Sequence, residues 1–256
     1  MDSGLPGRVK PLCTMVHMEQ IRVIVAGYDH YKGVDINPSS RVSQALAEHG
    51  MEGMRPVGPT EEDPLEGVDL TISSVTMPVS FAKAWPILHE AIERVRPDII
   101  IATGLKRRAR GIAMERCAVN LKEDDADDHD NLGERESQDP VRQTSRQPID
   151  PQGPAAYWTR LPLRAILHDF GTCGIPATLS SDAGTYVCNA LFYNLLAWAA
   201  GHKDVLAGFV SLPLVNESDG QECGLPLDQQ IQAVREVVNE TIRYYRRPSS
   251  SPILIA

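Results

Sequence analysis

Residues 180–200 read SSDAGTYVCNALFYNLLAWAA, and this stretch decides how the rest of the chain is interpreted. A strand pattern ends near Ser180, a turn of small residues follows, and Cys188 opens a segment that is apolar nearly all round. Such a segment is typical of a buried helix. The unsatisfied N–H groups and partial positive charge at a helix N-terminus stabilise a thiolate, lower the pKa of a cysteine and can hold an oxyanion. The position therefore indicates either a nucleophile or a packed core cysteine.

On both sides of this segment, strand patterns alternate with helix patterns. Short apolar runs predict buried strands, and alternation over Val68–Val75 predicts a half-exposed strand. The expected strands are 21–26, 68–75, 98–103, 175–180 and 206–212. The expected helices are 41–50, 80–95, 159–171, 188–200 and a last one from Leu227 to Tyr245 that stops before Pro248. Ser39 or Ser40 is expected to cap the first helix, and Pro86 is expected to bend the second. The third helix, 159–171, is also expected to be capped. The alternation predicts the α/β class, as one α/β/α sandwich with a largely parallel twisted sheet.

The chain divides by composition into one domain and its flanks. Residues 1–20 carry no regular period and are expected to form a loose leader. The domain is expected to span 21–247, followed by a tail at 248–256. The acidic run KEDDADDHD and the polar stretch after it predict a surface loop over 122–150, because apolar patterns resume beyond it.

Composition excludes several classes of protein. With 256 residues, 42% hydrophobic, the chain is long enough for a sizeable core. The net charge of −9 and the lack of a basic stripe argue against a nucleic-acid partner. No apolar run reaches the roughly 20 residues of a membrane helix, and the N-terminus lacks the apolar core of a secretory signal. We therefore expect a soluble cytoplasmic protein.

Metal and disulfide signatures are absent from the sequence. The five cysteines include no CxxC pair and the seven histidines no HxxxH or HExxH pair, so reduced thiols and no metal site are expected. The acidic run lacks the spacing and central glycine of an EF-hand. No glycine-rich loop follows a strand in phosphate-binding form, and no cofactor is predicted.

Several separated motifs resemble the pyroglutamyl peptidase I family of cysteine peptidases. AGTYVCN and the apolar helix after it are similar to the nucleophile segment of that family. The family's opening strand and loop are similar to IRVIVAGYDHYKGVDINPSS. Its second strand is similar to RPDIIIATGL, and its I-S-x-E-R-x-A-x-N motif is similar to IAMERCAVNL. Its A-Y-x-S-x-L-P segment is similar to PQGPAAYWTRLPLRAI. The motifs occur in the family's order and cover about residues 21–245, nearly the whole chain.

The resemblance implies a catalytic cysteine and glutamate, and it exposes a missing histidine. The family uses a Cys–His–Glu arrangement, whose cysteine falls on Cys188 and whose glutamate falls on Glu115 in MER; an ion pair with a neighbouring arginine is the other interpretation of Glu115. The family's histidine lies in a G-F-I-H-V-P strand, and here GFVSLP places Ser211 at that position. A serine hydroxyl cannot take a proton from a thiol near neutral pH, so the ordinary general base is missing.

The implied pocket differs as well. Where the family has two Phe residues that clasp the lactam ring, this chain has Tyr28 and Tyr31, and His30 replaces the Pro between them. His30 is a candidate substitute base, or a solvent-facing turn residue. The resemblance also assigns Asn37 and Leu105 to the substrate pocket. The stretch after Leu105, KRRAR, is more basic than the family's L-A-x-G-R, and it places Ala109 where the family's arginine aligns.

These residues predict a cysteine-dependent hydrolase or acyl-transfer enzyme. Its expected substrate is a small molecule or short peptide that offers a cyclic amide or related carbonyl. A repurposed, biosynthetic role is compatible with this substrate, and ordinary pyroglutamyl peptidase activity is expected to be weak or absent. The alternative is a catalytically inactive member of the family that binds a ligand or partner. The resemblance also implies a homo-oligomer.

Overall fold

A twisted six-stranded sheet forms the centre of the computed structural model, which describes residues 18–30, 33–34, 36–54, 62–123, 146–216 and 224–248. The strands follow the order β2-β1-β3-β10-β4-β9. β1 pairs parallel with β2 and β3, and β3 pairs parallel with β10. β4 pairs antiparallel with β10 and parallel with β9. The strands are β1 (Glu19–Tyr28), β2 (Val68–Met77), β3 (Ile99–Leu105), β4 (Ile112–Glu115), β9 (Ala177–Ser180) and β10 (Leu206–Leu212).

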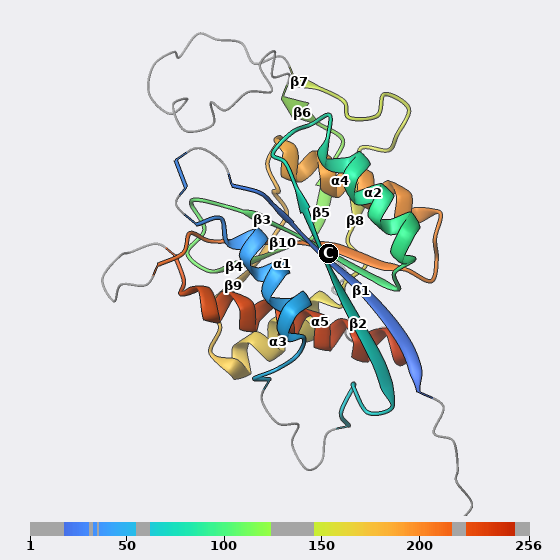
Figure 1. Cartoon of the computed structure of the whole chain (residues 1–256). Coiled ribbons are helices and arrows are strands. Elements are labelled where there is room, and N and C mark those ends of the chain that lie inside the picture. The colour runs from blue at the N-terminus through green and yellow to red at the C-terminus, as the bar shows by residue number, and fades with distance from the viewer. Residues whose placement is uncertain are drawn as a thin grey trace, which may run out of the picture.

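Five helices cover the two faces of this sheet (Figure 1). One face carries α1 (Pro38–His49), α3 (Leu163–Cys173) and α5 (Leu227–Arg246). The other face carries α2 (Ala84–Val95) and α4 (Val187–Ala200). The expected α/β/α sandwich with a largely parallel sheet is therefore confirmed.

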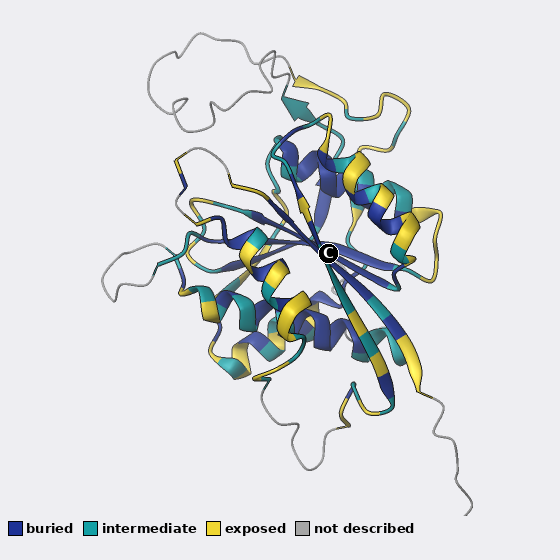
Figure 2. Ribbon diagram, viewed as in Figure 1, coloured by how far each residue is buried: buried dark blue, intermediate teal, exposed yellow. Residues whose placement is uncertain are grey.

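The core lies in two layers, one on each side of the sheet (Figure 2). Successive residues of β1 point to opposite faces: Ile21, Val23 and Val25 pack toward α1 and α5, while Ile24 and Ala26 pack toward α2 and α4. Burial on both faces explains why β1, β3 and β10 read as continuous apolar runs. In the described part of the chain, no helix has both the length and the apolar character needed to cross a bilayer.

Two small antiparallel pairs stand outside the main sheet. β5 (Cys117–Val119) pairs with β8 (Ala156–Trp158), and β6 (Lys122–Glu123) pairs with β7 (Arg146–Gln147). The second pair forms the base of the loop expected over 122–150. The acidic run beyond Glu123 falls outside the described residues.

Helix boundaries differ from expectation where a local cap decides them. α1 begins at Pro38, because Asn37 is its N-cap and accepts a hydrogen bond from Ser39 N at 3.2 Å. Pro86 lies in the first turn of α2, where its missing N–H breaks no helical hydrogen bond and no bend is required. α3 begins at Leu163, not Thr159, because residues 156–158 pair with β5.

The two ends of the chain fall partly outside the described residues. Residues 1–17 and 249–256 are not described, so most of the expected leader and tail is not seen. β1 begins at Glu19, two residues inside the segment expected as leader, because Glu19 N donates to Gly67 O at 2.9 Å and extends the pairing with β2.

Candidate active site

Cys188 is the second residue of α4, and its thiol lies against the carboxyl end of β3. A Cβ built on Gly104 of β3 would lie 2.8 Å from Cys188 Sγ and 2.8 Å from Phe209 Cζ. Real Cβ atoms do not approach other atoms this closely, so only glycine at position 104 lets the thiol rest against the sheet. The expected helix of 188–200 is thereby confirmed, with one further residue at its start.

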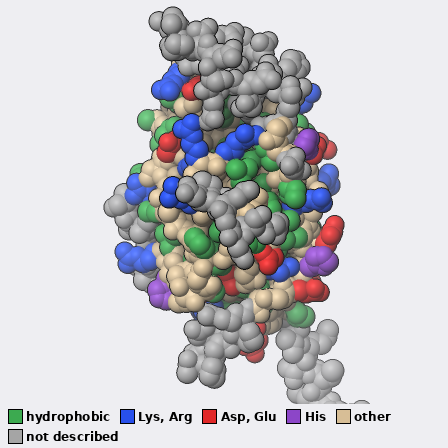
Figure 3. All heavy atoms as spheres, turned by 90° about the vertical axis from the view of Figure 1, so that its left-hand side faces the viewer, with side chains coloured by type: hydrophobic (Ala, Val, Ile, Leu, Met, Phe, Trp, Pro, Cys, Tyr) green, Lys and Arg blue, Asp and Glu red, His purple; other side chains and the backbone are tan. Residues whose placement is uncertain are grey.

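A pocket of about 200 Å³ opens beside the thiol. Its lining comes from the end of β1, the start of α1, the end of β3 and the start of α4. The lining residues are Tyr28, Asn37, Val79, Leu105, Tyr186, Val187 and Cys188. Figure 3 looks onto this side of the molecule, where β1, β3 and β10 end, and shows Lys and Arg side chains beside hydrophobic ones.

Tyr28 connects β1 to the nucleophile segment. Its side chain is buried, and its hydroxyl donates to Val187 O at 3.1 Å and is hydrogen-bonded with the Cys188 thiol. Burial, and next the charge of an ionised Cys188, raise the pKa of Tyr28 well above its ordinary value. Tyr28 therefore stays a neutral phenol, and its one O–H must turn away from Val187 O before it can donate to a thiolate or to a bound carbonyl.

The thiol itself is not activated in this state. Burial and, after it, the nearby Glu115 carboxylate raise the pKa of Cys188 to about 12, against the smaller lowering effects of Tyr28, Lys106 and its own backbone N–H. The backbone N–H at the helix start does lower the pKa of Cys188, but desolvation and a like charge outweigh it, so the expected net decrease is wrong. The side chain is a neutral thiol near pH 7.

Glu115 ends β4 and is fully buried behind the thiol. Its Oε1 accepts hydrogen bonds from Ser211 Oγ at 2.7 Å and from Lys106 Nζ at 3.1 Å. Within the described residues, Glu115 Oε2 has no hydrogen-bond partner. Ser211 is in register with Gly104, the residue under Cys188. The structure thus brings Cys188, Glu115 and Ser211 close together.

Lys106 completes this site, and sequence reasoning missed it. It is the first residue after β3, and its ammonium reaches Glu115 from the loop that leaves the sheet. The available signal was a lysine at the position where the family's L-A-x-G-R has a small residue. That signal was ambiguous, because the same loop also holds Arg107, Arg108 and Arg110.

Of the remaining predicted residues, some line the pocket and others do not. Asn37 and Leu105 line it. Asn37 also donates from Nδ2 to Asp29 O at 2.8 Å, which holds the loop after β1 to the start of α1. His30 is exposed and is not among the described lining residues. Tyr31 lies outside the described residues.

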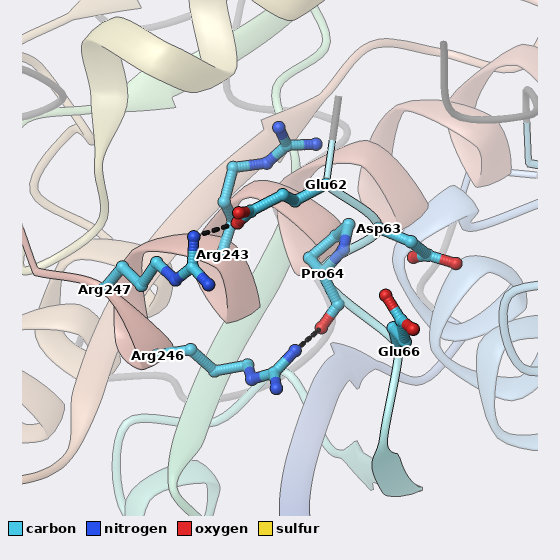
Figure 4. A pocket seen from close by; sticks show the side chains of 7 residues that line it. All are labelled: Glu62, Asp63, Pro64, Glu66, Arg243, Arg246 and Arg247. Carbon is cyan, nitrogen blue, oxygen red and sulfur yellow. Dashed lines mark hydrogen bonds and ion pairs between the residues drawn. The ribbon is translucent and has the colours of Figure 1, made fainter. Parts of the chain in front are cut away.

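A larger cavity, of about 490 Å³, lies away from this pocket, between the segment before β2 and the end of α5 (Figure 4). Its walls are mostly charged and are paired: Arg246 donates to Pro64 O at 2.8 Å, and Arg247 forms an ion pair with Glu62. Its described lining residues include no cysteine, serine or threonine. The chemistry of the molecule therefore centres on the smaller pocket.

Among the described residues, one group has the composition of a metal site. Asp169, Cys173 and Glu236 bring ligand atoms within 4.8 Å of one another on the α3–α5 side. Glu236 Oε1 already accepts from Gln232 Nε2 at 2.7 Å and from Cys173 Sγ at 3.9 Å. Hydrogen bonding accounts for this cluster without an ion.

A thiol at a helix N-terminus, beside a pocket at the ends of parallel strands and in front of a buried carboxylate, defines the class of a cysteine hydrolase on an α/β/α sandwich. The sequence model of the pyroglutamyl peptidase family matches residues 21–244. With that match over most of its length, the chain belongs to the pyroglutamyl peptidase family.

Individual relatives agree with this assignment. The chain is 32% identical to a pyrrolidone-carboxylate peptidase of Brevibacillus brevis, over 88% of this chain and 94% of that one. It is 34% identical to a pyrrolidone-carboxylate peptidase of Yersinia pestis, over 80% and 84%. The crystal structure of Bacillus amyloliquefaciens pyroglutamyl peptidase I is similar with a TM-score of 0.69 and 30% identity, over 88% and 98%.

Proposed function

We propose that this protein is a Cys188-dependent hydrolase that opens an amide or related carbonyl bond next to a small cyclic amide, with weak activity on ordinary pyroglutamyl peptides. The observation that carries this proposal is the position of Cys188 at the start of α4, where its thiol lines the pocket and is hydrogen-bonded with Tyr28. The two curated relatives above are named pyrrolidone-carboxylate peptidases, which supports the same reaction class here.

The chemistry follows the order of nucleophilic acyl transfer. Cys188 Sγ forms a bond to the substrate carbonyl carbon, and the thiol proton finally leaves with the amine. The amides at the start of α4 can hold the oxyanion that develops. Water then hydrolyses the thioester and releases the acid.

The weak point of this site is proton transfer. Ser211 donates its hydrogen to Glu115, and a hydroxyl is a poor base for a thiol whose pKa is about 12. A positioned imidazole contributes about 10²–10⁴-fold in rate. We therefore expect this chain to be slower than a relative with histidine at this position by a factor in that range.

The substrate need not be a plain pyroglutamyl group. Tyr28 brings a phenolic hydroxyl to the pocket floor, and Asn37 brings a polar amide at its edge. The Tyr28 O–H donates to Val187 O, so its oxygen can accept from a ligand, and Asn37 Nδ2 has a second N–H beside the one given to Asp29 O. A ring with a polar substituent can bond to these atoms more fully than an unsubstituted lactam. We propose a polar cyclic amide or related carbonyl compound, as a small molecule or at the end of a short peptide.

Ser211 favours a second candidate, a non-catalytic ligand-binding member of the family. A fluorogenic pyroglutamyl amide distinguishes the two. Wild type should release the amine slowly, Cys188→Ala should not release it above the background rate, and Ser211→His should release it faster than wild type. Ser211→Ala is the matched control, because it removes the hydroxyl without adding a base.

Both candidates can fail in this assay. Rapid hydrolysis by wild type would contradict the proposed weakness of the site. Wild type equal to Cys188→Ala, with no gain in Ser211→His, would favour the binding protein. Thermal midpoints of all variants should stay close to wild type, so that loss of the fold is not mistaken for loss of chemistry.

A further inference from the structure

Lys106 lies at the junction of three parts of the site. Its ammonium contacts Glu115 Oε1 of β4 at 3.1 Å, Ser180 Oγ at the end of β9 at 3.1 Å, and Asp182 O in the turn before α4 at 2.7 Å. An ammonium has three N–H donors. Each donor thus has an acceptor, and the nitrogen has no lone pair left to accept a proton.

Because each N–H donor of Lys106 has an acceptor, two possible roles of this residue can be distinguished. A lysine that serves as general base must present a nitrogen lone pair to the thiol, and the three contacts of Lys106 Nζ run to acceptors other than the thiol. Its partner Glu115 is fully buried, while the Lys106 side chain is 34% exposed. A buried carboxylate without a cation is costly, and Ser211 supplies only a neutral donor.

The position of this charge matters because the thiol is close to it. Ser211 bonds the same Glu115 oxygen as Lys106 and is in register with Gly104, against which Cys188 Sγ rests. The carboxylate raises the pKa of Cys188 and the ammonium lowers it. Removing either charge should therefore change the readiness of the thiol to ionise, in opposite directions.

We propose that Lys106 is the positioning residue of the Cys188 site. Its ammonium supplies the positive charge opposite Glu115 that a histidine at position 211 would supply. It also holds the turn from which α4 begins. The proposal rests on Cys188 as the reactive group of the proposed function. It assigns Lys106 no proton transfer.

The test measures ionisation of the thiol without any substrate. The second-order rate of iodoacetamide alkylation at Cys188 is followed by peptide mass spectrometry between pH 7 and pH 10. Lys106→Met should slow the reaction about tenfold, as a loss of one charge partner shifts a nearby pKa by about one unit or more. Lys106→Arg should stay near the wild-type rate. Glu115→Gln should react faster than wild type.

Lys203→Met is the matched control, because Lys203 is an exposed lysine in the turn before β10, at the other end of that strand from Ser211. It should alkylate like wild type. Circular dichroism and the thermal midpoint establish that each variant is folded. If Lys106→Met does not fold, Lys106→Arg and Glu115→Gln still test the proposal, because it expects an unchanged alkylation rate in the first variant and a faster rate in the second.

A merely structural Lys106 would give a different pattern. Loosening of the turn would expose the thiol and speed alkylation in both Lys106→Met and Glu115→Gln. Equal or faster alkylation in folded Lys106→Met, or no acceleration in Glu115→Gln, would overturn the proposal. Failure of wild type to hydrolyse any cyclic amide would instead count against the proposed function alone, because the alkylation rates do not depend on turnover.

Discussion

At the scale of single residues, the chemistry of Cys188 is set by its neighbours more than by its helix. The start of α4 offers backbone N–H groups, yet burial and Glu115 together raise the thiol pKa to about 12. Tyr28 and Lys106 act in the opposite direction and do not compensate. The resting protein therefore holds a protonated nucleophile whose ionisation needs help from a base or a bound substrate.

The raised pKa predicts a pH dependence of stability. Because the unfolded chain loses the Cys188 proton first, near the ordinary pKa of 9.0, the folded state should lose stability as the pH rises from 9.0 to about 12. Below pH 9.0, Cys188 should contribute no slope. Denaturant midpoints at pH 8 and pH 10.5 measure this. Cys188→Ala should lose less stability than wild type over that interval, and an identical loss would contradict the assigned pKa.

His30 stays a prediction as a substitute base or substrate-orienting residue. The ring is exposed, and the backbone N–H of His30 donates to Asp29 Oδ1 at 2.7 Å in the loop after β1. Closure of this loop over substrate would be needed to bring the imidazole inward. If that happens, His30→Ala should lose about 10²-fold or more in kcat, and this loss should not add to that of Cys188→Ala, because the two residues would act as one catalytic unit. Full activity of His30→Ala would exclude the role; His89→Ala, on the exposed side of α2, is the control.

At the scale of elements, the start of α4 and the end of β3 fit only because position 104 lacks a side chain. Phe209 of β10 and Cys188 of α4 both touch the space that a Cβ at Gly104 would occupy. This close packing sets the depth of the thiol in the pocket. It also links the position of the nucleophile to the two central strands, which are the most buried part of the sheet.

Gly104→Ala should therefore destabilise the protein and displace the thiol. We expect a loss of about 1–3 kcal/mol in the free energy of unfolding, as overpacking typically costs, together with faster alkylation of Cys188. Gly171→Ala is the matched control. Gly171 lies inside α3 with nothing within 4 Å of its added Cβ, so it should gain about 0.5–1 kcal/mol from helix propensity. Denaturant unfolding of both variants measures the difference, and equal stabilities would refute the packing argument.

Helix and strand boundaries also show where local patterns suffice. The range 206–212 is predicted to the residue, because β10 is apolar apart from Ser211 and is buried on both faces. β4 is not predicted as a strand: it has only four residues, and its last one is the buried Glu115. A charged residue at a buried strand end looks like a surface residue until its partners Lys106 and Ser211 are known.

At the scale of the whole molecule, the sheet order creates the site. β10 lies between β3 and β4, so Ser211 stands between Gly104 and the strand that carries Glu115. α4 packs against β10, and its second residue, Cys188, lies at this point (Figure 1). Residues separated by many tens of positions in the chain thereby meet within one hydrogen-bonded group.

Assembly into a homo-oligomer, which the family resemblance implies, stays a prediction. We expect sedimentation velocity to give a mass that is a multiple of one chain at micromolar concentration. The acidic net charge of −9 disfavours non-specific association by mutual repulsion, so a defined multiple would indicate a specific symmetric interface. A single-chain mass throughout would contradict the prediction, and raised salt serves as the control for charge effects.

The sequence by itself determined the α/β/α class, the central strands and the buried helix that Cys188 opens, because burial and periodicity are recorded in local patterns. Its motifs also identified Cys188, Glu115 and the substitution at Ser211. Only the tertiary structure decided that the pKa of the Cys188 thiol is raised and that Lys106 contacts Glu115. Both depend on desolvation and on charges that reach the site from separate strands, and the distances between such groups are set by sheet order and packing, which no local pattern contains.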